Sequence, residues 1–120
     1  MISMDHLRRR VLRAGLDDWI PLQAIDGMMR QLGVPAGAEA KVMGLALIYD
    51  LARERLVEIG DVTDRGFVPW EVPVELAIQR IAEEWQDSDG DRWAFFCWLS
   101  NTEQGDREAF NGPAKDDPCY

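Results

Sequence analysis

The sequence predicts an α+β domain that is mostly helical, and three observations support this fold class. Four segments repeat apolar residues at the three- and four-residue spacing of amphipathic helices. Residues 56–70 place apolar residues on both sides of a turn signal at residues 63–66, as a β-hairpin does. The chain has 120 residues, which is the length of one domain built around a single core.

The first predicted helix covers residues 6–14 and carries one apolar stripe, with its arginines mainly off that stripe. Asp5 can cap the start of the helix, and Gly15 is a typical residue for its end. A short extended piece should follow, because Pro21 disfavours a helical backbone at Ile20.

Two further helices are predicted before the hairpin. Residues 22–32 repeat apolar side chains at helical spacing, and Gly33 with Pro35 ends that segment. Residues 37–55 form the next helix, which is apolar on nearly every side over residues 42–51. We therefore expect this third helix to be central and covered by the others.

The hairpin and the helix after it carry sharper signals. Gly60 is a candidate β-bulge, and Pro69 restricts the second strand to a sheet edge, since proline cannot donate a ladder hydrogen bond. Pro73 fits the first turn of a fourth helix, whose apolar stripe runs without interruption from Val74 to Trp85.

The rest of the chain is less regular. Residues 93–99 are too short for periodicity to separate a buried strand from a buried helical turn, although their aromatic content favours a strand. Residues 111–120 have the proline, glycine and acid content of a frayed terminus. The prediction is a single domain over residues 1–110, followed by an acidic tail over 111–120.

The order helix, extended piece, helix, helix, hairpin, helix resembles the winged helix-turn-helix arrangement over residues 4–87. This resemblance is one of topology and includes no residue motif. In that superfamily the third helix is usually presented to DNA and the hairpin is the wing. The chain also resembles small bacterial proteins of unknown function at residues 58–70 and 98–105, and that likeness implies no activity.

The charge argues against nucleic acid as a partner. Lys and Arg number 13 against 22 Asp and Glu, which gives a net charge of −9 and an isoelectric point near 4.5. The excess is uneven: five basic residues balance five acids in residues 1–40, whereas three face ten in residues 81–120. Such a field repels phosphate backbones and anionic lipids and favours a basic protein partner. With no signal peptide or apolar membrane span, we expect a cytoplasmic protein with no membrane contact.

The winged-helix resemblance nevertheless keeps an alternative function open, a DNA-binding transcriptional regulator. Its contacts would come from basic residues on the first helix, the third helix and the wing. These residues are Arg8, Arg9, Arg10, Arg13, Lys41 and Arg65. We favour a simpler interpretation of the four N-terminal arginines, a solvated helix face that pairs with Asp17 and Asp18.

Metal binding and catalysis find little support in the residue pattern. Residues 87–91 resemble the start of an EF-hand loop, but Arg92 replaces the required glycine and Trp98 the bidentate glutamate. The single histidine and the two cysteines lack the spacing of a zinc site. We therefore expect no metal site, no cofactor and no catalytic residue.

Protein binding is the function that remains. Of the five tryptophans, Trp19 and Trp70 lie beside acids at predicted strand edges and are the candidates for partial exposure. The predicted protein-binding residues are Trp19, Trp70, Asp61, Asp64, Glu71, Asp87, Asp89 and Asp91. They predict a non-enzymatic module of the immunity, antitoxin or regulatory-adaptor type that masks or docks a basic protein. The sequence leaves a homodimer open.

Overall fold

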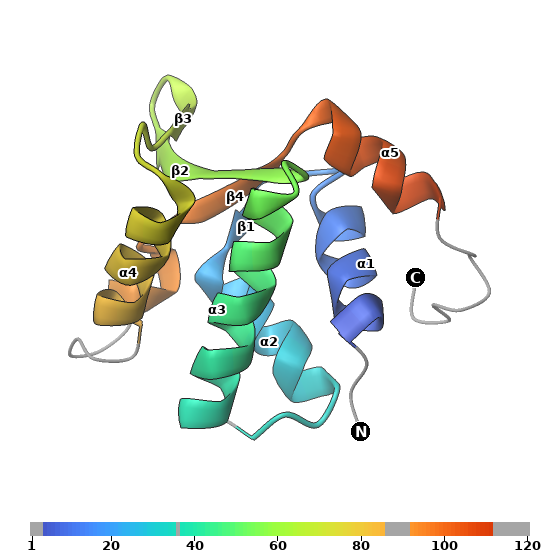
Figure 1. Ribbon diagram of the computed structural model, residues 1–120, viewed down its shortest axis with the longest axis vertical. Coiled ribbons are helices and arrows are strands. Elements are labelled where there is room, and N and C mark those ends of the chain that lie inside the picture. The colour runs from blue at the N-terminus through green and yellow to red at the C-terminus, as the bar shows by residue number, and fades with distance from the viewer. Residues whose placement is uncertain (1–3, 36, 86–91, 112–120) are drawn as a thin grey trace.

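Helices pack against one side of a small sheet in the computed structural model, which describes residues 4–35, 37–85 and 92–111 (Figure 1). This confirms the predicted α+β, mostly helical fold class. In chain order the described elements are α1 (Met4–Ala14), β1 (Ile20–Pro21), α2 (Leu22–Gln31), α3 (Ala38–Arg53), β2 (Val57–Thr63), β3 (Gly66–Pro69), α4 (Val74–Glu84), the 3-10 helix η1 (Arg92–Phe95), β4 (Trp98–Asn101) and α5 (Glu103–Asn111).

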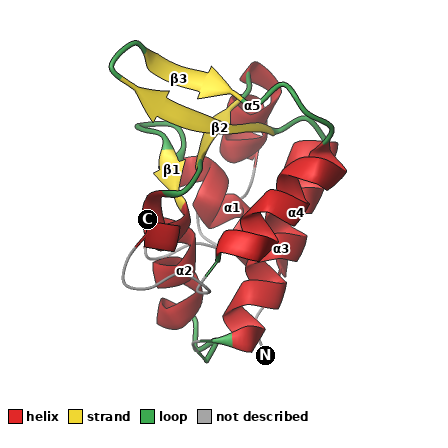
Figure 2. Cartoon of the chain, turned by 90° about the vertical axis from the view of Figure 1, so that its left-hand side faces the viewer, coloured by secondary structure: helices red, strands yellow, loops and turns green. Residues whose placement is uncertain are grey.

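The four strands form one antiparallel sheet in the order β1-β4-β2-β3. It lies across one end of α1 to α4, so that only one of its faces meets these helices (Figures 1 and 2). β3 is an edge strand, as Pro69 predicts. β4 lies between β1 and β2 and thereby joins the hairpin to the N-terminal part of the chain.

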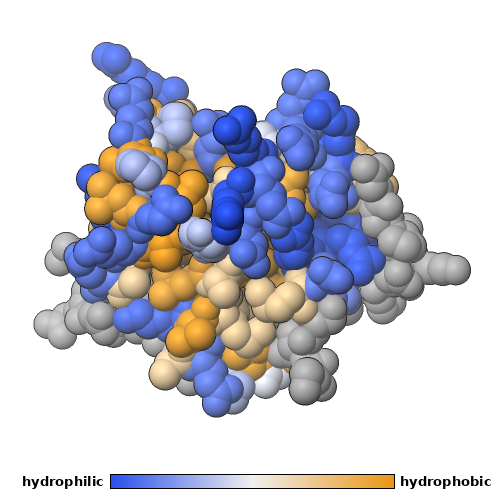
Figure 3. Space-filling model, in the orientation of Figure 1, coloured by the Kyte–Doolittle hydropathy of each residue, from blue (hydrophilic) through white to orange (hydrophobic). Residues whose placement is uncertain are grey.

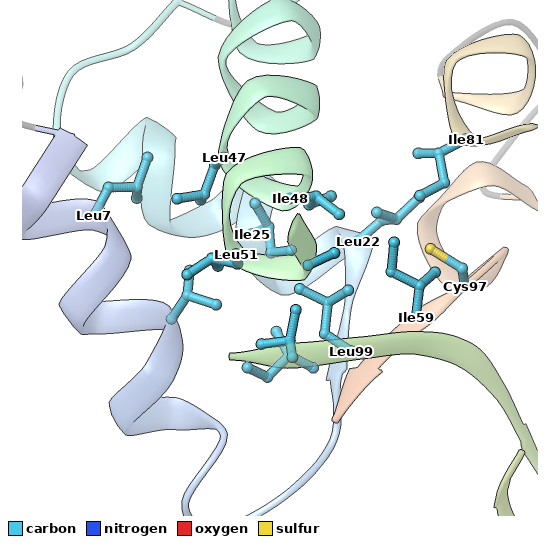
Figure 4. Packing of buried hydrophobic residues seen from close by; sticks show 14 of the residues in the cluster. Leu7, Leu22, Ile25, Leu47, Ile48, Leu51, Ile59, Ile81, Cys97 and Leu99 are labelled. Carbon is cyan, nitrogen blue, oxygen red and sulfur yellow. The ribbon is translucent and has the colours of Figure 1, made fainter. Parts of the chain in front are cut away.

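α3 is the central helix, with α1 and α2 on one side and α4 on the other (Figure 1). Its C-terminal half is buried through Leu47, Ile48 and Leu51, and Figure 4 shows Ile59 and Leu99 of the sheet packed into the same cluster. The expectation that α3 is covered all round is wrong at its N-terminal half, where Val42 is 66% exposed. Neighbours on two sides leave a strip of the helix open to solvent.

A glycine sets the distance between α3 and α4. A Cβ atom at Gly44 would overlap the indole ring of Trp85, which is fully buried. That ring also stacks on Trp93 of η1, with centroids 5.8 Å apart and planes at 10°. Gly44 therefore lets one large side chain join α3, α4 and η1.

Gly60 is not a β-bulge, so this prediction is wrong. The register runs without an extra residue on both sides of Gly60, which pairs with Trp98 on β4 and Pro69 on β3. The glycine is needed for a different reason: a Cβ here would overlap the carbonyl of Val68 and lie 2.7 Å from the Cα of Pro69. Close backbone approach, rather than a bulge, accounts for glycine at this position.

The segment after residue 91 contains both conformations that the sequence left open. Residues 92–95 form η1, and the strand that the aromatic content favours follows as β4. Helix α5 is not among the predicted elements, because its composition is polar. The Thr102 hydroxyl accepts the N–H of Gly105 at 3.0 Å and so caps this helix. Asn111 is the last residue of α5 rather than the start of a tail, and residues 112–120 lie outside the described residues.

Candidate protein-binding surface

The face of the sheet that points away from the helices carries aromatic side chains. Ile20, Leu99 and Ile59 are cross-strand neighbours and are all buried on the helix side. Because side chains alternate along a strand, the residues next to them lie on the opposite face. That outer set is Pro21, Trp98, Gly60, Val62, Phe67 and Pro69.

Two aromatic pairs are partly exposed to solvent there. The ring of Trp19, just before β1, stacks on Phe67 with centroids 6.3 Å apart and planes at 30°. The ring of Phe95 packs against that of Trp98, with centroids 5.8 Å apart. Trp19 is 37% exposed and Phe95 51%. These four residues are called the outer aromatic face below.

An acidic hollow of about 400 Å³ adjoins this face at Trp19. Its lining includes the carboxylates of Asp17, Asp18 and Asp106, together with Asn101. The Asp106 carboxylate accepts a hydrogen bond from the side-chain amide of Asn101 at 3.1 Å. The Asp18 carboxylate accepts one from the backbone N–H of Trp19 at 2.8 Å. None of the three carboxylates forms an ion pair within the described part of the chain. The hollow therefore offers negative charge beside an indole ring.

Trp70 lies elsewhere, on the helix side of the hairpin. Its indole N–H donates to the Asp61 carboxylate at 3.0 Å, and its ring meets Phe96 edge-on at 5.7 Å. The Arg80 guanidinium lies over the same ring at 5.4 Å from its centroid. Trp19 and Trp70 are thus on opposite faces of the sheet, and the structure does not bring them into one surface.

The other predicted protein-binding acids are scattered. Asp64 lies in the hairpin turn and Glu71 follows β3, both exposed. Asp87, Asp89 and Asp91 lie outside the described residues. Asp17, Asp18 and Asp106 are not among the predicted site residues, because only the pairing of β1 with β4 and the docking of α5 place them together.

The N-terminal arginines contact other helices. Arg8 donates two hydrogen bonds to the Glu54 carboxylate, at 2.6 and 3.1 Å, and Arg10 donates to the Gln31 side-chain carbonyl at 2.8 Å. Their partners are not the predicted Asp17 and Asp18, because α1 turns these side chains toward α3 and α2.

Arg13 is only 6% exposed, so its predicted place on a solvated face is wrong. Its Nε donates to the Ala109 carbonyl of α5 at 3.3 Å, and the unforeseen helix is what covers it. Arg9 is half-buried on α1 and Lys41 half-buried on α3. Arg65 is exposed at the tip of the hairpin. A row of free arginines for phosphate contact is therefore not formed.

The Arg8–Glu54 pair should make stability depend on pH. The hydrogen bond from Arg8 holds the pKa of Glu54 below its usual value of 4.5, against the opposing effect of burial. A depressed folded-state pKa stabilises the protein above the unfolded value, and this contribution is lost as pH falls through the folded value. The Glu54 side chain is half exposed, so we expect Glu54→Gln to cost less than about 1 kcal/mol at neutral pH.

Denaturant unfolding of the wild type and Glu54→Gln at several pH values checks this. The difference in free energy should vanish below the lowered pKa of Glu54. Glu103→Gln removes the more exposed pair with Arg107 and serves as the control, with a smaller effect at neutral pH. A difference that stays constant across the acid range would contradict the assignment.

Cys97 is buried, and its burial, with a contribution from the Asp61 charge, raises the pKa of the thiol, so the thiol stays protonated at neutral pH. Over residues 4–35, 37–85 and 92–111, no three His, Cys, Asp or Glu side chains are placed to hold a metal ion.

No protein-family model, curated protein or solved structure matches the chain. Membership of the winged helix-turn-helix superfamily thus stays a prediction from element order. No helix in the described ranges is long and apolar enough to cross a membrane.

Proposed function

We propose that this chain is a non-catalytic protein-binding module that docks or masks a basic partner protein, as immunity proteins, antitoxins and regulatory adaptors do. The observation that supports this most directly is Trp19, 37% exposed, stacked on Phe67 and placed at the edge of the acidic hollow. Its surroundings supply both the apolar and the electrostatic part of recognition.

The outer aromatic face supplies the apolar part. Tryptophan concentrates binding energy in protein interfaces because it buries a large rigid surface at a small cost in conformational entropy. Phe67 fixes the ring of Trp19, and Phe95 with Trp98 extends the apolar area over the same side of the sheet. A partner that covers this face would bury side chains that the domain's own core does not use.

The acidic hollow supplies the charge. A lysine or arginine side chain of a partner can enter between Asp17, Asp18 and Asp106 with its cation near the Trp19 ring. Carboxylates and a tryptophan face both attract cations, through charge pairing and through the ring quadrupole. The net charge of −9 adds long-range attraction for a basic protein.

Binding of a labelled, tryptophan-free peptide of alternating arginine and glycine, followed by fluorescence anisotropy, tests the proposal. Trp19→Ala should weaken binding roughly 30-fold, the effect of a hot-spot residue. Leu76→Ala, which truncates an exposed apolar residue on α4, is the matched control and should change affinity less than about twofold. The unfolding midpoint of each variant shows whether the fold is kept.

A second pair of variants separates a site from general attraction. Asp17→Asn with Asp18→Asn removes two charges at the hollow, and Glu39→Gln with Glu75→Gln removes two exposed charges on α3 and α4. We expect at least about a tenfold loss for the first pair and a small loss for the second. Equal losses for both pairs, or unchanged binding by Trp19→Ala, would overturn the proposal.

A further inference from the structure

A second concave site lies on the helix side of the hairpin, away from the outer aromatic face. It is a groove of about 320 Å³ between the C-terminal end of α3, β2 and the N-terminal end of α4. Figure 3 shows apolar residues gathered on this side of the molecule, over α4 and beneath β2. The apolar part of its lining includes Val57, Ile59, Trp70, Val72, Val74 and Ala77.

One cation, Arg55, lies at the rim of this groove, and its backbone is strained. Its φ of 62° makes it the only non-glycine residue with positive φ in the described ranges. The position ends α3 in a Schellman motif: the Leu56 N–H donates to the Leu51 carbonyl at 2.9 Å, and the Arg55 N–H to the Ala52 carbonyl at 3.0 Å.

Glycine is the favoured residue at such a position, since a Cβ atom strains the left-handed conformation. Stability therefore does not explain the arginine. Its side chain is exposed and forms no ion pair with another described residue. A residue that opposes local stability while it places a free charge on a groove is a candidate for ligand binding.

The strand at the groove also presents backbone hydrogen-bonding groups. The Trp70 N–H donates to the Ile59 carbonyl at 2.8 Å, so Ile59 directs its backbone groups toward β3. Alternate residues of an antiparallel strand point the same way, so the N–H and C=O of Val57 do too. β3 ends at Pro69, before it reaches Val57, and no described residue bonds to Val57 on that side.

We propose that this groove binds the C-terminal residue of an extended peptide. The apolar side chain of that residue fills the cavity, its carboxylate pairs with Arg55, and its backbone pairs with Val57. The volume is at the lower end of that of ligand pockets, which suits one terminal residue rather than a long segment. Arg55 selects the partner's chemistry, because guanidinium groups bind carboxylates with paired charge-assisted hydrogen bonds.

Glu58 also borders the groove, but it alternates with the buried Val57 and Ile59, so its carboxylate lies on the outer face of the sheet. Glu58→Gln therefore serves as a control and should change binding of a free C-terminus by less than about twofold. Arg55→Gly should weaken that binding and, at the same time, raise the unfolding midpoint by relief of the left-handed strain. Opposite effects on stability and affinity from one substitution would not arise if Arg55 were only a structural residue.

Isothermal titration calorimetry with a short alanine peptide ending in valine and leucine tests the site. We expect the free-acid peptide to bind the full chain. C-terminal amidation of the peptide, or Arg55→Gly in the protein, should lower the affinity at least about tenfold. Arg55→Asn, which also tolerates positive φ, should show the same loss. Equal affinity for acid and amide, or unchanged binding by either variant, would overturn the proposal, and so would N-acetyl-leucine binding as tightly as the peptide.

Discussion

Replacing Trp85 with alanine is expected to lower the free energy of unfolding by about 3–5 kcal/mol, the cost of removing a fully buried aromatic side chain. The indole fills the space above Gly44 on α3 and stacks on Trp93, so its loss leaves a cavity at the junction of α3, α4 and η1. Denaturant unfolding followed by far-ultraviolet circular dichroism measures the change.

Gly44→Ala provides the complementary test of this contact. The added Cβ would overlap the fully buried indole, so in the wild type we expect a loss of about 1–3 kcal/mol from overpacking. In the Trp85→Ala background the overlap is gone, and the alanine should stabilise helix α3 by about 0.5–1 kcal/mol. If Gly44→Ala has the same sign in both backgrounds, the two residues are not coupled as the structure shows.

Gly105→Ala is expected to destabilise the protein by about 2–3 kcal/mol, in the upper part of the overpacking range. A Cβ at this position would overlap the Leu56 carbonyl oxygen, a backbone atom that cannot rotate away. Helix α5 would have to move away from Leu56, and with it the cover over Arg13. Denaturant unfolding measures the loss, and hydrogen exchange in α5 should become faster than in α3.

Gln104→Ala is the matched control, because it changes an exposed side chain on the neighbouring position of the same helix. It should alter stability by less than about 0.5 kcal/mol. A large effect at Gln104, or a neutral one at Gly105, would show that α5 does not dock through its glycine.

The elements with strong local signals could be predicted from the sequence. The uninterrupted stripe from Val74 to Trp85 corresponds to α4, and the turn signal at residues 63–66 closes the β2–β3 hairpin. Pro69 correctly indicates an edge strand. Helix α5 could not be predicted from the sequence because few of its residues are apolar, and its start is marked mainly by the Thr102 cap.

The candidate surfaces could be predicted from the sequence only in part. Trp19 is partly exposed, as its acidic neighbours predict. Only the strand register shows that Trp19 and Trp70 lie on opposite faces of the sheet. Asp106 lies 88 residues beyond Asp18 and joins it in the hollow only through the β1–β4 pairing and the docking of α5. Arg55 resembles any charged helix end until its backbone angle is known.

Periodicity and turn chemistry, which act over a few residues, determine where helices and the hairpin of this protein form. Charge composition likewise gives the net charge of −9, on which the proposal of a basic partner rests. The tertiary structure alone decided that Arg13 is buried, that Gly60 and Gly105 accommodate backbone contacts, and which carboxylates share a hollow. Each of those outcomes depends on residues far apart in the chain that meet when strands and helices pack, and no local pattern encodes such meetings.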